Sequence, residues 1–219
     1  MIKKALLVLL LFDAAFVSAQ SKLRLGVHLD PLITWFSPKT SRIDKDGSRP
    51  GLSGGLIVEY YFQQNYGFIT GLSLTTMGGN LLYSDQVNIT TDNNNNVLVE
   101  AGSTVAYRTG YLNIPVAVKL KTNEIGYFTY FAQLGLTQHI SIGARATSTG
   151  NGLSKDNVDK EINLFGMSYF FGGGLEYNIS GRTSLMAGLF YNNGFIDVLS
   201  NNDHKAVLNY FNLRLGILF

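Results

Sequence analysis

The sequence has no cysteine among its 219 residues and only four prolines. The absence of cysteine excludes disulfide bonds and thiolate metal sites. Charged residues make up 15% of the chain, below the share of about a quarter that is usual in soluble domains. The net charge of +2 is too small to predict nucleic-acid binding. By contrast, aromatic residues reach 12% and there are 24 glycines, a composition that excludes disorder and favours β-strands.

Long apolar runs are also absent after the first twenty residues, and this excludes a membrane-spanning helix in the rest of the chain. The N-terminal stretch has two lysines, an apolar run over residues 5–16 and the small-residue pattern Val17-Ser18-Ala19. This order is typical of a secretory signal peptide, predicted as residues 1–19, with the exported domain over 20–219. An uncleaved N-terminal membrane anchor is the alternative, which the short run and Asp13 disfavour.

Apolar and polar residues alternate with a period of two along most of the chain, which is the pattern of β-strands with two different faces. In the closing stretch "NYFNLRLGILF", for example, every second residue from Phe211 to Phe219 is large and apolar. The same pattern predicts eight strands, at residues 22–36, 51–62, 66–78, 111–121, 127–143, 165–179, 183–191 and 209–219.

The connections between these strands are alternately long and short. The long ones are predicted as polar surface loops at 37–50, 79–104, 144–162 and 192–204, whereas the short ones are tight turns such as "QQN" and "SGR". We therefore expect an all-β fold, an eight-stranded antiparallel up-and-down barrel with its tight turns at one end. Such a barrel is just wide enough for side chains to fill it.

The composition of the two faces decides whether the barrel lies in water or in a membrane. The polar face is rich in glycine and poor in the charged residues that a water-facing strand carries, whereas the apolar face is almost purely aliphatic and aromatic, as lipid requires. Aromatic residues near the strand ends predict two interfacial girdles: Trp35, Tyr60, Tyr61, Tyr66, Tyr107, Tyr111, Tyr127, Tyr177 and Tyr191. A soluble ligand-binding barrel is a weaker alternative.

The polar face, turned towards the lumen, carries nearly balanced charges. They form a predicted lumen charge network of Arg24, Asp30, Glu59, Lys119, Glu176 and Arg214. Charges at membrane depth must pair or line water. We therefore expect salt bridges that fill the barrel, and the alternative is a lining that selects small solutes.

Several stretches resemble those of a known family. "YLNIPVAVKLK" at 111–121 is similar to a segment of PorT-like proteins, which are small bacterial outer-membrane barrels, and "FAQLGL" and "FFGGGLEY" fit the same family. Asn113 replaces the acidic residue common in that segment, so no role of that carboxylate is carried over. The ending on Phe219 resembles the C-terminal signal that barrel-assembly machinery recognises. Pro115 predicts a local irregularity, because proline cannot donate to a strand ladder.

An enzymatic role is not expected, although one pair of residues requires a test. His139 and Ser141 share a strand face, and their spacing resembles the His/Ser pair of outer-membrane lipid A deacylases. No acidic residue follows closely to orient the histidine, and both side chains are predicted to face the lumen, so a structural role is favoured. The acidic loop residues do not match a calcium-binding spacing. No cofactor and no metal is predicted.

The sequence thus predicts a protein of the bacterial outer membrane with a structural, surface-interaction or secretion-accessory role. A narrow porin-like channel and a lipid-modifying enzyme are the alternatives. The expected partners are outer-membrane lipid, the barrel-assembly machinery during biogenesis, and proteins that bind the surface loops.

Overall fold

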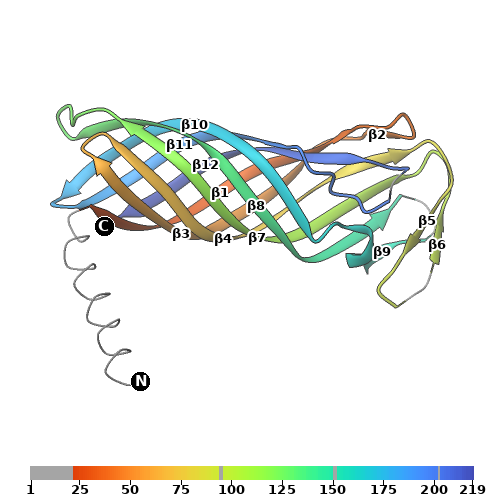
Figure 1. Cartoon of the computed structure of the whole chain (residues 1–219). Helices are drawn as coiled ribbons and strands as arrows, with labels where there is room; N and C mark the ends of the chain where they lie inside the picture. The colour runs from red at the N-terminus through yellow and green to blue at the C-terminus, as the bar shows by residue number, and fades with distance from the viewer. Residues whose placement is uncertain (1–21, 94–95, 150–151, 202) are drawn as a thin grey trace, which may run out of the picture.

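The computed structural model describes residues 22–93, 96–149, 152–201 and 203–219, and it is a closed eight-stranded antiparallel β-barrel (Figure 1). Each strand pairs with its neighbours in chain order, and β12 pairs with β1 to close the barrel. The barrel strands are β1 (Leu23–Pro38), β3 (Arg49–Gln63), β4 (Tyr66–Tyr83), β7 (Thr104–Lys121), β8 (Phe128–Ser148), β10 (Phe165–Ser180), β11 (Thr183–Gly194) and β12 (Ala206–Leu218). The predicted fold class is confirmed, and the predicted signal peptide lies outside the described residues.

The part of the barrel nearer the tight turns carries a continuous apolar band on its outer face. On β8 the outward side chains Leu134 and Leu136 are 63% and 49% exposed, whereas the intervening positions face inward. On β1 the outward positions Leu25 to Ile33 follow the same rule. A transmembrane strand needs about 9–11 residues, so the band is long enough to span a bilayer. We call this surface the lipid-facing band.

Glycine allows neighbouring strands to approach closely within this band. A Cβ atom at Gly71 would lie 2.2 Å from the carbonyl oxygen of Leu56, and one at Gly55 would lie 2.1 Å from that of Leu72. No other residue fits at these two positions of β3 and β4 without moving the backbone.

The aromatic residues divide between the two faces. Tyr60, Tyr66, Tyr127 and Tyr177 are exposed near the tight-turn end, as a girdle requires. For three other tyrosines the prediction was wrong. Tyr107 and Tyr111 are buried inside the barrel, and the half-buried Tyr61 donates a hydrogen bond to Glu59. Their parity on the strand places them on the inner face, and proximity to a strand end does not override it.

The long connections were predicted as solvated loops, and this was wrong for much of their length. The barrel strands β4, β7 and β8 extend at least five residues past their predicted ends, and the connections add β2 (Ile43–Lys45), β5 (Val87–Thr90), β6 (Asn96–Val99), β9 (Ser154–Asn157) and the short helix η1 (Asp159–Glu161). β2 pairs with β4, β9 with β8, and β5 with β6. These elements and the strand ends that carry them lie at the end of the barrel opposite the tight turns (Figure 1). We call this region the cap.

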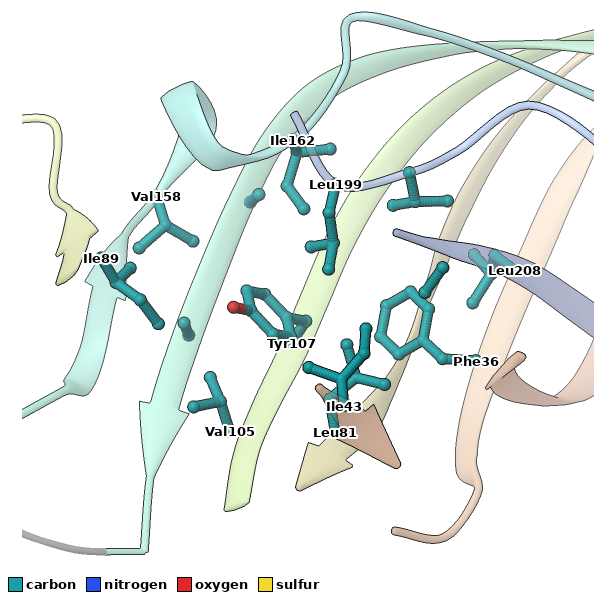
Figure 2. Packing of buried hydrophobic residues seen from close by; sticks show 14 of the residues in the cluster. Phe36, Ile43, Leu81, Ile89, Val105, Tyr107, Val158, Ile162, Leu199 and Leu208 are labelled. Atoms are coloured by element: carbon teal, nitrogen blue, oxygen red, sulfur yellow. The ribbon is translucent and has the colours of Figure 1, made fainter. Parts of the chain in front are cut away.

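The cap has a hydrophobic core of its own. Phe36, Leu81 and Tyr107 extend from the barrel strands into its centre, where they meet Ile43 from β2 and Val158 beside η1 (Figure 2). All five side chains are at most 1% exposed. Inward-facing positions of the barrel therefore change from polar to apolar as the strands leave the band. The apolar alternation in the loop sequences was too short to predict this core, because it is assembled from segments far apart in the chain.

The irregularity predicted at Pro115 is milder than expected. Bridges between β4 and β7 are missing beside Pro115, yet the register is the same on both sides of the gap. The register shift in β7 and β8 lies instead between Gly110 and Tyr111, opposite Ser141 and Gly143. This β-bulge lies where the lipid-facing band ends and the cap begins. Among the described residues, no helix is long and apolar enough to cross a membrane.

Candidate functional site

The polar interior of the band begins near the tight turns with four ion-paired side chains from four strands. Lys119 of β7 donates to Glu59 of β3 at 2.6 Å and also to Glu176 of β10. Arg24 of β1 completes the set, with its guanidinium 2.5 Å from the second oxygen of Glu176. We call these four residues the basal ion cluster. Two cations and two carboxylates give it no net charge.

The basal ion cluster is largely buried among neighbouring side chains. The Lys119 side chain is 0% exposed and lies 4.6 Å from the ring centroid of Phe131. Tyr61 donates to the free oxygen of Glu59 at 2.7 Å, and Arg24 donates to Ser184 at 2.6 Å. Each carboxylate oxygen therefore has a donor, which is the condition under which buried ion pairs are tolerated.

The remaining two charges of the predicted network form a second group, farther from the tight turns and nearer the cap. Arg214 of β12 donates to Asp30 of β1 at 3.0 Å, and Asn212 donates to the same carboxylate oxygen at 2.9 Å. The other oxygen of Asp30 lies 2.7 Å from the His28 ring. The six predicted residues thus divide into the basal ion cluster and this pair, and within the described part of the chain no hydrogen bond or salt bridge joins the two groups.

A chain of uncharged polar side chains crosses the barrel at the level of His139. His139 lies 2.7 Å from the oxygen of Asn113 and 2.8 Å from the hydroxyl of Ser168. Asn113 in turn donates to Thr75, whose hydroxyl lies 2.7 Å from that of Ser53. We call these five residues the polar belt. It links β10, β8, β7, β4 and β3, and sequence reasoning missed it because its members share no local motif.

The polar belt replaces the His/Ser pair that the sequence suggested. His139 bonds to Ser168 on the neighbouring strand, and among the described residues no hydrogen bond joins it to Ser141, its partner in the catalytic pair that the sequence suggested but did not favour. Ser141 pairs with Tyr111 in the same register in which His139 pairs with Asn113, and the β-bulge comes only after Ser141. Asn113, His139 and Ser168 resemble an orienting amide, a base and a nucleophile, in that order. All three side chains, however, are buried within the barrel. The arrangement fits a structural network better than a site that lipid can reach.

The interior leaves little room for a solute. Between the polar belt and Arg214 there is a cavity of about 30 Å³, and one of about 20 Å³ lies beside His139 and Tyr210. Each is large enough for only one or two water molecules. A wider vestibule of about 550 Å³ opens among the tight turns, lined by Lys22, Lys121 and Arg182 among others, and it ends at Arg24 and Glu176.

One loop histidine was predicted to be solvated and is buried instead. His204, between β11 and β12, is 5% exposed and lies against the ring of Tyr83, at 5.2 Å between centroids. Neither ring nitrogen has a hydrogen-bond partner among the described residues. Burial lowers the pKa of His204 below its usual 6.5, and nearby Arg42 lowers it further, whereas Asp203 opposes the shift. Within the described residues, no group of three or more His, Cys, Asp or Glu side chains could hold a metal ion.

Comparison with known proteins identifies the family. The profile of a family described as the outer membrane protein beta-barrel domain matches residues 18–204. The chain belongs to this family. Its barrel therefore lies in the bacterial outer membrane, as the lipid-facing band requires. No curated protein matches the sequence.

Solved structures of other outer-membrane proteins are similar over most of this chain. Neisserial surface protein A is 15% identical, with 89% of this chain and 95% of that chain covered and a TM-score of 0.49. Ail of Yersinia pestis, in complex with the heparin analogue sucrose octasulfate, is 16% identical, with 90% and 99% covered and a TM-score of 0.43. OprG of Pseudomonas aeruginosa is 12% identical, with 90% and 97% covered and a TM-score of 0.41.

Proposed function

We propose that this protein is a closed outer-membrane barrel that holds a folded cap at the cell surface, where the cap acts in structure or interaction. The observation that carries this proposal is the filling of the interior at three levels. The basal ion cluster, the polar belt and the apolar core of the cap follow one another along the axis. An interior filled in this way favours a scaffold over a channel.

The orientation follows from the general architecture of such barrels. Bacterial outer-membrane barrels place short turns in the periplasm and long connections outside the cell. The vestibule of Lys22, Lys121 and Arg182 would then face the periplasm, and the cap would face the medium. A secretion-accessory role, which the resemblance to PorT-like proteins implies, would use a partner at either end.

Conductance separates this proposal from a narrow channel. Residues 20–219, the predicted exported domain, are reconstituted in planar bilayers, and single-channel current is recorded at neutral pH. We expect no discrete current steps from the wild-type protein. A channel lined by the charge network would give steps whose ion selectivity changes in the variant Glu59→Gln, and that result would contradict the proposal.

Photo-crosslinking in living cells tests the interaction role. A photoreactive side chain replaces Leu98 on the cap, which is 49% exposed, or Leu72 on the lipid-facing band, which is 46% exposed. We expect protein adducts from position 98 and none from position 72. If position 98 gives no adduct under any growth condition while the protein is present at the surface, a purely structural role remains.

A further inference from the structure

The outer surface of β7 and β8 carries two arginines directly opposite each other where the cap begins. Arg108 pairs in register with Arg145, and both side chains are exposed. Like charges directly opposite on neighbouring strands destabilise a sheet. Such a pair is therefore expected where a ligand of opposite charge compensates for the repulsion.

The protein itself provides little compensation for this pair. The Arg145 side chain donates to Asn157 at 3.3 Å, and no salt bridge within 4.0 Å joins either arginine to a described carboxylate. Asp159 lies nearby and is the one acid that lines the same hollow, but its Oδ1 accepts a hydrogen bond from the backbone amide of Ala144. The hollow therefore retains one net positive charge.

The arginines line an open hollow of about 470 Å³. Glycine makes this space, because Gly110 and Gly143 beside the β-bulge have no side chains to fill it. The floor of the hollow includes Ile142, which is 60% exposed and belongs to the lipid-facing band. A single site thus combines an apolar surface at membrane depth with two guanidinium groups directly above it.

The height of the arginines points to the lipid headgroups. On β7 the outward residues Leu120 to Leu112 are apolar, Gly110 follows, and Arg108 is the next outward side chain. On β8 Arg145 is the first outward charged residue after Ile142.

We propose that Arg108 and Arg145 form a binding site for the phosphate of an anionic lipid in the outer leaflet. Guanidinium groups bind phosphate oxygens through paired hydrogen bonds, and an acyl chain of the same lipid lies along Ile142. The site is distinct from the lumen and does not depend on whether the barrel conducts. It rests on the proposed orientation only in that the cap faces the outer leaflet.

Lipid binding to the purified full-length barrel in detergent tests this site. The probes are diphosphorylated lipid A and the same lipid with both phosphates removed, and bound lipid is counted by native mass spectrometry across a titration. The double variant Arg108→Gln/Arg145→Gln is compared with Lys45→Gln/Lys155→Gln, which removes the same charge from elsewhere on the cap. We expect the affinity of the arginine variant for the phosphorylated lipid to fall about tenfold. The lysine variant should bind this lipid as the wild type does.

Three outcomes would overturn the proposal. Equal losses in the two double variants would show that only the overall charge matters. Equal binding of the dephosphorylated lipid would show that the phosphate is not recognised. Displacement of the lipid by an equal concentration of inorganic pyrophosphate would show a site for soluble phosphate in place of a lipid site.

A stability measurement separates a loss of lipid binding from a change in folding. In detergent free of phosphate and lipid, Arg108→Gln relieves the repulsion from Arg145, so the midpoint of thermal unfolding should stay the same or rise. Phosphorylated lipid A should then raise that midpoint less in the variant than in the wild type. A lower midpoint for Arg108→Gln without lipid would show that Arg108 is already compensated within the protein.

Discussion

The interior of the band and the interior of the cap occupy the same inward-facing positions of the same strands, yet they are filled by opposite chemistry. On β7 the inward residue Lys119 is held by two carboxylates at the lower end, whereas Tyr107, twelve residues earlier, packs into an apolar core. The difference follows from what surrounds each level. Lipid covers the outer face of the band, so apolar residues are placed outside and the polar ones inside.

The cap stands in water and reverses this arrangement. Its outer positions carry Arg108, Arg145 and other polar residues, and its buried positions carry Phe36, Leu81 and Val105. The cap is therefore stabilised as a soluble domain is, by burial of apolar surface. The band interior is stabilised by complete pairing of polar groups, because each group left unpaired there costs free energy.

The largest effect is expected where one partner of the basal ion cluster is removed. Lys119→Met leaves the buried carboxylate of Glu59 and one oxygen of Glu176 without their cation. The free energy of unfolding should therefore fall by about 3–5 kcal/mol. Equilibrium unfolding in urea with lipid vesicles, followed by Trp35 fluorescence, measures it. The double variant Lys119→Met/Glu59→Gln retains the Arg24–Glu176 pair and should recover more than half of the loss. A double variant as unstable as the single one would contradict this account.

A cavity made in the cap core should destabilise the cap and leave the band intact. Leu81→Ala removes a fully buried side chain and should cost about 2–5 kcal/mol within the cap. Hydrogen exchange should then accelerate in β2 and in the upper ends of β4 and β7, while amides of the band remain protected. The neighbouring Leu82, which is only half-buried, provides the control as Leu82→Ala. Loss of protection throughout the barrel would show that cap and band unfold together.

The cap core also contains one buried pair of hydroxyls, and its loss should cost less. The hydroxyls of Tyr83 and Tyr107 lie 2.7 Å apart. Tyr107→Phe leaves the Tyr83 hydroxyl without this partner and should cost about 1 kcal/mol in the free energy of unfolding. Tyr66→Phe on the exposed face should cost nothing measurable by the same urea titration. Equal effects of the two variants would show that the hydrogen bond between Tyr83 and Tyr107 does not stabilise the cap.

The smallest effect is a dependence of cap stability on pH. Burial lowers the pKa of His204 in the folded state below the value of 6.5 expected after unfolding. The unfolded state then binds more protons as pH falls below that value, so the stabilisation present above pH 6.5 is lost as pH falls through the folded-state pKa. The variant His204→Leu should reduce the slope of unfolding free energy against pH, and an unchanged slope would exclude His204 as its source.

The sequence predicted the band well and the cap poorly. Strict alternation over stretches such as 127–143 is a strong local signal, so the eight strands and their inward and outward faces could be derived from it. The six charges of the predicted network could be picked out from the sequence, because a charge on a strand with few charges is conspicuous. Their partners could not be derived, since Lys119 and Glu176 are 57 residues apart and meet only after closure.

The cap and the polar belt depend on information that no local pattern contains. Val158 and Ile43 lie in segments that read as polar loops, and they are buried only because both segments fold over the same barrel opening. Similarly, the hydroxyl partner of His139 is Ser168 on the neighbouring strand β10, 29 residues away in the sequence. The cost of an unpaired buried histidine then selects whichever hydroxyl the barrel places within reach.

Accessibility of the lumen from water tests the central claim most directly, and the cysteine-free chain makes the measurement simple. Ser53→Cys places a single thiol in the polar belt, at a position 6% exposed, and Thr147→Cys places one on the outer face of the cap. Both variants, in sealed vesicles and in detergent, are treated with a charged methanethiosulfonate. The account predicts rapid labelling at position 147 and none at position 53 under either condition. Rapid labelling at position 53 in the folded barrel would show a water-filled path through the lumen and would contradict the closed interior.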